Sequence, residues 1–102
     1  MSSLGFSNSS SNIKWNIDGN LLVINSAYYA NERNNSETIT IVRFNNISHI
    51  HFSKPHFYEG IKKDGYISVH STANYSIPFR SENMSKAEEF FELLITKINI
   101  AV

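Results

Sequence analysis

Cysteine is absent from this chain of 102 residues, and proline and glycine are scarce, with 2 and 4 residues respectively. The lack of cysteine excludes disulfides, thiolate zinc sites, iron–sulfur clusters and cysteine nucleophiles. No run of about 18 apolar residues occurs, so the sequence predicts no membrane span. The first twelve residues, MSSLGFSNSSSN, contain neither a basic residue nor an apolar run. We therefore expect no secretory signal and a cytoplasmic protein.

Neither sign of charge dominates, because 9 Lys and Arg residues balance 9 Asp and Glu residues. Nucleic-acid binding draws on clustered basic residues that meet phosphates, so nucleic acid is not an expected partner. Hydrophobic residues make up 41% of the chain and aromatic residues 13%, which suffices for one modest core. At about 100–200 residues per domain, the length predicts one domain. Frequent Ile and Asn indicate the coding bias of a low-GC bacterium or its phage.

Most of the chain has the pattern of short β-strands. Residues 1–12 are mostly Ser and Asn, so we expect a flexible tail there and a single domain over residues 13–102. Alternation over Ile13–Ile17, a turn at Asp18-Gly19-Asn20 and the apolar run Leu21–Tyr29 together predict a hairpin. A polar loop is expected at Ala30–Glu37, and a further turn at Asp64-Gly65. The remaining strands are expected at Thr38–Phe44, Ile47–Phe52, Phe57–Lys62, Tyr66–His70 and Tyr75–Phe79. Pro78 has no N–H, so we expect it at the end of the last strand or on an edge strand.

The pattern becomes helical after Ser81. Ser85 followed by Glu88 has the spacing of a capping box. Apolar side chains at helical spacing then form one stripe, made of Ala87, Phe90, Phe91, Leu94 and Ile98. The sequence therefore predicts a helix over about Ser85–Asn99.

Antiparallel strands followed by one amphipathic helix indicate a mainly β, α+β fold. We expect six or seven strands in two sheets or a partly open barrel, closed by the C-terminal helix. The chain resembles bacterial pleckstrin-homology-like (PH-like) domains in the order of its elements. The matching segments are the Asn12–Ile24 hairpin, ITIVRFNNISHIHF, YSIPF and AEEFFELLITKI. The resemblance implies two nearly orthogonal sheets, few ligands and homo-oligomers. Relatives that bind phosphoinositides use basic residues around the first hairpin, where this chain has only Lys14, so lipid headgroup binding is not expected.

No catalytic constellation is apparent. The acidic residues fall in predicted turns, loops, a short strand and the helix, and none interrupts a strongly apolar strand. Gly60 and Gly65 have the spacing of a P-loop, but Tyr66 and Ile67 stand where Lys and Ser or Thr are required. We expect a non-enzymatic protein with no cofactor.

Histidines supply the only candidate metal ligands. His49 and His51 share one face of a predicted strand, so both imidazoles can reach one ion. His56 is a candidate third ligand, and Glu59 is the one nearby carboxylate. The same histidines also suit the solvated face of a half-buried strand without any metal. His70 alone is interpreted as a packed or surface histidine.

Two groups of side chains are candidate contact surfaces for a protein partner or a second copy. Off-stripe apolar residues of the helix, including Leu93, belong either to a broad buried face or to such a contact. A basic, aromatic group lies just after the histidines, and we interpret it either as a partner surface or as lysines that protect sheet edges; it comprises Lys54, Phe57, Tyr58, Lys62, Lys63 and Tyr66. The first hypothesis is thus an interaction or self-assembly module, and the alternatives are a metal site or a phage-encoded inhibitor of a host protein.

Overall fold

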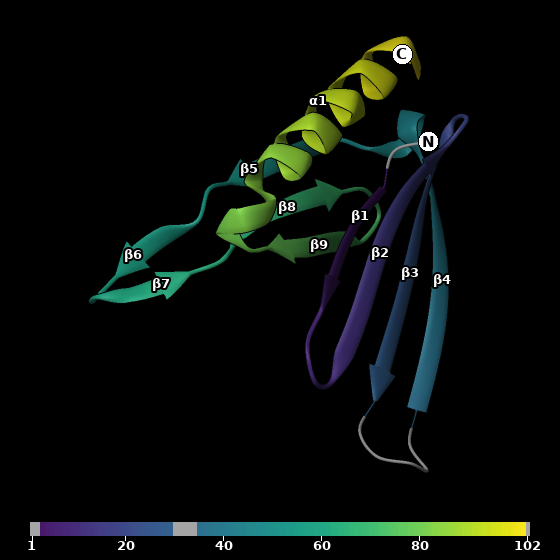
Figure 1. Cartoon of the computed structure of the whole chain (residues 1–102). Helices are drawn as coiled ribbons and strands as arrows, with labels where there is room; N and C mark the ends of the chain where they lie inside the picture. The colour runs from purple at the N-terminus through teal and green to yellow at the C-terminus, as the bar shows by residue number, and fades with distance from the viewer. Residues whose placement is uncertain (1–2, 30–34, 102) are drawn as a thin grey trace.

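The computed structural model describes residues 3–29 and 35–101 (Figure 1). It is mainly β, with several antiparallel sheets and one C-terminal helix, as the sequence predicts. The described residues form nine strands, more than the six or seven expected. They are β1 (Ser3–Ser7), β2 (Ser11–Asp18), β3 (Leu21–Tyr29), β4 (Asn35–Arg43), β5 (His49–Ser53), β6 (His56–Tyr58), β7 (Ile61–Lys63), β8 (Gly65–His70) and β9 (Asn74–Phe79).

The first four strands form an antiparallel sheet in the order β1-β2-β3-β4. The β2–β3 hairpin turns at Gly19-Asn20, and Gly19 has a φ of 59°, a conformation that glycine adopts at little cost. This confirms the predicted hairpin. Alternation then sends Trp15 and Ile17 into the core while Lys14 stays on the outer face. Residues 30–34 of the predicted polar loop lie outside the described residues, whereas Asn35–Glu37 belong to β4.

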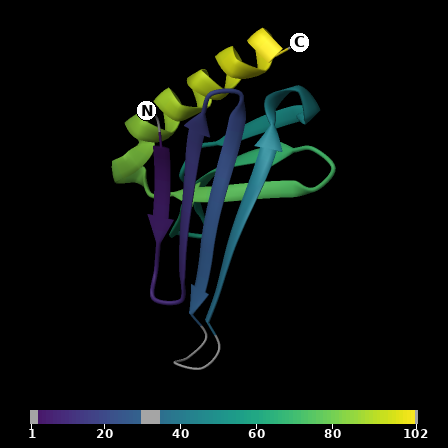
Figure 2. The ribbon, with the colours of Figure 1, turned by 90° about the vertical axis from the view of Figure 1, so that its right-hand side faces the viewer.

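Strands β5, β8 and β9 form a second antiparallel sheet in that order, with β9 and its Pro78 at an edge, as predicted. A short 3-10 helix, η1 (Phe44–Asn46), links the two sheets. Between β5 and β8, the strands β6 and β7 pair only with each other and form a ribbon that extends away from the body of the molecule (Figure 1). Figure 2 shows the three-stranded sheet crossing behind the four-stranded one.

The helix α1 (Met84–Ala101) follows a 3-10 turn, η2 (Ser81–Asn83), and runs over the sheets (Figure 1). Ser85 lies inside this helix and not at its N-cap. The helix buries Ala87, Phe90 and Leu94, the centre of the predicted stripe. The Phe90 ring lies 6.5 Å from the ring of Trp15 in β2, so α1 joins the core that both sheets line. Within the described residues, no helix has the length and apolar character needed to cross a membrane.

Two expectations about the chain are wrong. Residues 3–7 are not part of a loose tail, because they form β1 and pair with β2 over Ser3–Ser7. Leu4 is buried in the core, and the Arg80 guanidinium lies 4.7 Å above the Phe6 ring, so tertiary contacts order this polar segment. The turn expected at Asp64-Gly65 is also wrong, because Gly65 is a buried residue of β8. The turn in this part of the chain lies at Glu59-Gly60, between β6 and β7.

Candidate metal centre

Three histidines meet on the outer face of the three-stranded sheet. The strand His49–Ser53 alternates, so Ile50 and Phe52 face the core while His49 and His51 face outward. The register of β5 with β8 pairs His49 directly with His70. One candidate ligand nitrogen from each of His49, His51 and His70 lies within 4.8 Å of the other two. We refer to these three residues as the histidine cluster.

The rings of the histidine cluster are packed against one another. The imidazoles of His49 and His70 stack with centroids 4.2 Å apart and an interplanar angle of 13°. The His51 ring stands edge-on to both, with 5.1 Å between centroids in each case. Tetrahedral coordination at Zn–N distances of 2.0–2.1 Å places ligand nitrogens about 3.3 Å apart. An imidazole binds a metal ion in the plane of its ring, so the stacked rings of His49 and His70 must turn out of their parallel arrangement to share one ion.

Neighbouring polar groups orient two of the three imidazoles. The Ser48 hydroxyl donates to the carbonyl oxygen of His70 at 3.0 Å, so its oxygen is left to accept from Nδ1 of His49, 3.1 Å away. Nδ1 of His70 lies 2.7 Å from Oδ1 of Asn74, which can only accept. We assign both protons to Nδ1, which leaves the Nε2 lone pairs available. Such outer partners commonly fix the tautomer of metal-binding histidines.

The electrostatics at His49 favour its neutral imidazole. Desolvation, followed by the nearby His70 and His51, lowers the pKa of His49 below its ordinary value of 6.5. The neutral imidazole is the form that binds a metal ion. A cluster that resists protonation at His49 is thus prepared for ligation at neutral pH.

The structure separates one of the sequence-predicted candidate ligands, His56, from the other two. His56 lies in β6, where its Nδ1 is 3.2 Å from the Lys54 carbonyl oxygen, and it is not part of the histidine cluster. Glu59 lies in the turn of the β6–β7 ribbon. His70, which the sequence pattern alone places as a packed or surface histidine, is the third member of the histidine cluster. Only the pairing of β5 with β8 reveals this, because 21 residues separate His49 from its partner along the chain.

The predicted partner surface is divided among several faces. Pairing of Phe57 with Lys62 and of Tyr58 with Ile61 puts these two pairs on opposite faces of the β6–β7 ribbon. Phe57 and Tyr58 are 73% and 61% exposed. Tyr66 belongs to β8, and Leu93 packs half-buried against the core.

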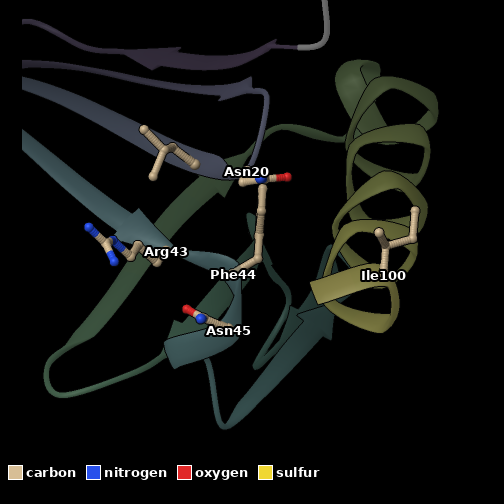
Figure 3. Close-up of a pocket in the computed structure, with 6 residues that line it drawn as sticks. Asn20, Arg43, Phe44, Asn45 and Ile100 are labelled. Atoms are coloured by element: carbon tan, nitrogen blue, oxygen red, sulfur yellow. The ribbon is translucent and has the colours of Figure 1, made fainter. Parts of the chain in front are cut away.

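A surface hollow of about 550 Å³ lies between the β2–β3 turn, η1 and the end of α1 (Figure 3). Its lining includes the amide side chains of Asn20 and Asn45 and the apolar side chain of Ile100. The Arg43 guanidinium points away from Ile100. The lining brings no second charged group to Arg43, so the histidine cluster is the stronger candidate for a site.

Comparisons with protein-family models, with curated proteins and with solved structures find no match for this chain.

Proposed function

We propose that this protein binds a divalent transition-metal ion through His49, His51 and His70. The observation that carries the proposal is the convergence of three imidazoles from two paired strands within 4.8 Å. Imidazole nitrogens suit Zn²⁺, Cu²⁺ and Ni²⁺ and are poor ligands for Mg²⁺ or Ca²⁺. Ser48 and Asn74 supply the supporting hydrogen bonds that such ligands require.

Three protein ligands leave one tetrahedral position for water or for a group from outside the chain. His49 and His51 are solvent-exposed and His70 is half-buried, so that position opens to solvent. Within the described residues, the histidine cluster includes no carboxylate that would act as a general base beside bound water. The arrangement therefore supports binding of a metal ion that keeps one coordination position open to solvent.

The first prediction tests this site by thermal unfolding with and without Zn²⁺ or Ni²⁺. Binding at one hundred times the dissociation constant should raise the free energy of unfolding by about 2.7 kcal/mol and increase Tm. His51→Ala and His70→Ala should each abolish the shift. His56→Ala is the matched control, because it removes an exposed histidine outside the histidine cluster, and it should leave the shift intact.

Isothermal titration calorimetry gives a second readout that does not depend on Tm. One binding event per chain is expected for the parent protein and for His56→Ala, and none for His70→Ala. The proposal fails if neither ion shifts Tm, or if His56→Ala abolishes binding while His70→Ala retains it.

We also infer that the fold belongs to the PH-like class. A four-stranded antiparallel sheet is followed by a three-stranded one and then by a C-terminal helix, which is the element order that the sequence resemblance implies. The β6–β7 ribbon is then an insertion between the first two strands of the second sheet. An experimental structure compared with PH-like domains tests this assignment.

A second candidate function is non-enzymatic self-assembly. The observation that favours it is the edge of the four-stranded sheet, where β4 presents nine residues with Ile39 68% and Ile41 59% exposed. A long edge strand with apolar side chains is a template for pairing with another chain. Sedimentation velocity over a range of concentrations tests whether the protein associates.

A further inference from the structure

The edge formed by β4 lacks most of the devices that usually prevent strands from pairing between molecules. Natural edge strands are kept short or carry charged residues, especially lysine, proline or bulges. The strand β4 reads NSETITIVR over nine residues and includes neither lysine nor proline. By contrast, β1 has five residues and is joined to Arg80, which donates from Nη2 to the Ser7 carbonyl oxygen at 3.1 Å. Strand β9, another edge, carries Pro78.

The backbone groups that β4 turns outward can be identified from its pairing with β3. The Phe44 N–H donates to the Asn20 carbonyl oxygen at 3.4 Å, in the same register that pairs Val42 with Leu22. Hydrogen-bonded pairs alternate along an antiparallel ladder, so the even-numbered residues of β4 bond to β3. The odd-numbered residues therefore direct their N–H and C=O groups away from the sheet; they are Asn35, Glu37, Ile39, Ile41 and Arg43.

We propose that two copies of this chain pair antiparallel through β4, around a two-fold axis at Thr40. In this register residue 37 of one copy lies opposite residue 43 of the other, and residue 39 lies opposite residue 41. All of these are odd-numbered residues, so each pair exchanges two hydrogen bonds between groups that already point outward. The two four-stranded sheets then become one continuous sheet.

The side chains of β4 are more complementary to themselves in this register than in either neighbouring one, each of which keeps a single Ile–Ile pair on its axis. On the outer face, Glu37 meets the second copy's Arg43, and Ile39 meets the second copy's Ile41; the axis repeats both pairs. A shift of two residues in one direction places Ile41 opposite Glu37, and a shift in the other places Arg43 opposite Ile39. Opposite charges and apolar pairs across strands stabilise a sheet, whereas these mixed pairs do not.

The inner face of β4 agrees with the same axis. Thr40 meets its own copy, and Val42 meets the second copy's Thr38, so β-branched side chains face each other throughout. Val42 is buried and Thr38 is exposed. Because the strands run in opposite directions, the exposed half of β4 around Thr38 lies beside the half of the second copy's β4 around Val42, which that copy's core covers.

This inference deepens the self-assembly proposal and rests on it. It makes a charge-reversal prediction that self-assembly by another surface does not. Glu37→Arg and Arg43→Glu each create two like-charged pairs across the axis, and each should raise the dimer Kd about tenfold. The double variant Glu37→Arg/Arg43→Glu restores opposite charges and should return the Kd to near the parent value. Sedimentation velocity in the presence of EDTA measures the Kd without metal-bridged association.

Cross-linking locates the axis independently, because the chain has no cysteine of its own. Two Thr40 residues form a non-hydrogen-bonded pair with Cα atoms about 4.5 Å apart, within the range of a disulfide. Thr40→Cys should therefore give a covalent dimer under mild oxidation. Thr38→Cys is the matched control on the same face. Its two copies lie four residues apart along the strand, about 13 Å, so it should remain uncross-linked.

The outcomes separate the two levels of the proposal. A strict monomer at all concentrations overturns self-assembly and the β4 pairing together. The β4 register is overturned, and self-assembly is not, if neither single charge reversal changes the dimer Kd. The same holds if the Thr38→Cys variant cross-links and the Thr40→Cys variant does not. Recovery in the double variant together with a Thr40→Cys cross-link supports both.

Discussion

At the scale of single residues, the first position of β8 has room for a hydrogen atom and nothing larger. A Cβ added to Gly65 would lie 2.5 Å from a ring carbon of Phe79 and 2.5 Å from the carbonyl oxygen of Ser53. The glycine thus lets β5 and β9 approach β8 closely. The dipeptide Asp64-Gly65 predicts a turn, because glycine next to aspartate is common in turns, and only the packing distinguishes a turn glycine from one in a crowded strand.

Gly65→Ala should therefore destabilise the protein by about 1–3 kcal/mol, the usual cost of overpacking. Urea denaturation measures the difference. Gly5→Ala is the control, because the nearest atom to its added Cβ is the Ile13 carbonyl oxygen at an ordinary 3.8 Å. Equal effects of the two substitutions would contradict the close approach at Gly65.

His49 links the histidine cluster to the pH dependence of folding. Desolvation and the neighbouring His70 and His51 lower the pKa of His49 in the folded protein. As the pH falls through 6.5, the unfolded chain takes up a proton at this residue before the folded protein does. The free energy of unfolding should therefore decrease from pH 6.5 down to the folded pKa, and it should carry no such penalty above 6.5.

Tm measured against pH in EDTA tests this expectation. His49→Gln should flatten the acid side of the profile, and His56→Gln, at a histidine outside the cluster, is the control. An unchanged profile in His49→Gln would show that other groups govern acid stability.

At the scale of elements, β1 shows how tertiary contacts override local composition. Its sequence, SLGFS, has little strand character, and its composition predicts a flexible tail. Pairing with β2, burial of Leu4 and the stacking of Arg80 on Phe6 supply the stabilisation that the segment alone lacks. Arg80 comes 73 residues after Ser7, its hydrogen-bond acceptor, so no local pattern contains this information.

Leu4→Ala should cost about 2–5 kcal/mol of unfolding free energy, because it empties a site in the core. Chemical denaturation measures the cost, and hydrogen exchange of β1 shows whether the strand detaches. Ser3→Ala, at an exposed position of the same strand, should change stability by less than about 0.5 kcal/mol. A small effect of Leu4→Ala would mean that β1 contributes little to the fold.

Other elements were predictable because local signals determine them. Turn residues at Gly19-Asn20 and a dense apolar run defined β3 with its observed bounds, Leu21–Tyr29. The apolar stripe located the buried side of α1, although the helix extends to Ala101 and begins before Ser85. The sequence predicts one strand over Phe57–Lys62, because aromatic and basic residues run through this segment. The structure has two strands there, β6 and β7, which are separated by a turn at Glu59-Gly60.

At the scale of the whole molecule, the two proposed activities lie on different sheets. The histidine cluster lies on β5 and β8, whereas the edge of β4 belongs to the four-stranded sheet. Two of the three cluster residues, His49 and His51, were predicted from alternation along one strand. The third, His70, and the outward odd-numbered residues of β4 both depend on strand register, which residue patterns do not specify without the pairing partners.

Trp15 is the one tryptophan of the chain, fully buried where β2 meets α1, and its indole N–H has no hydrogen-bond partner within the described part of the protein. Intrinsic tryptophan fluorescence therefore originates at the junction of sheet and helix alone. The emission of this buried indole therefore reports whether the C-terminal helix is packed against the strands.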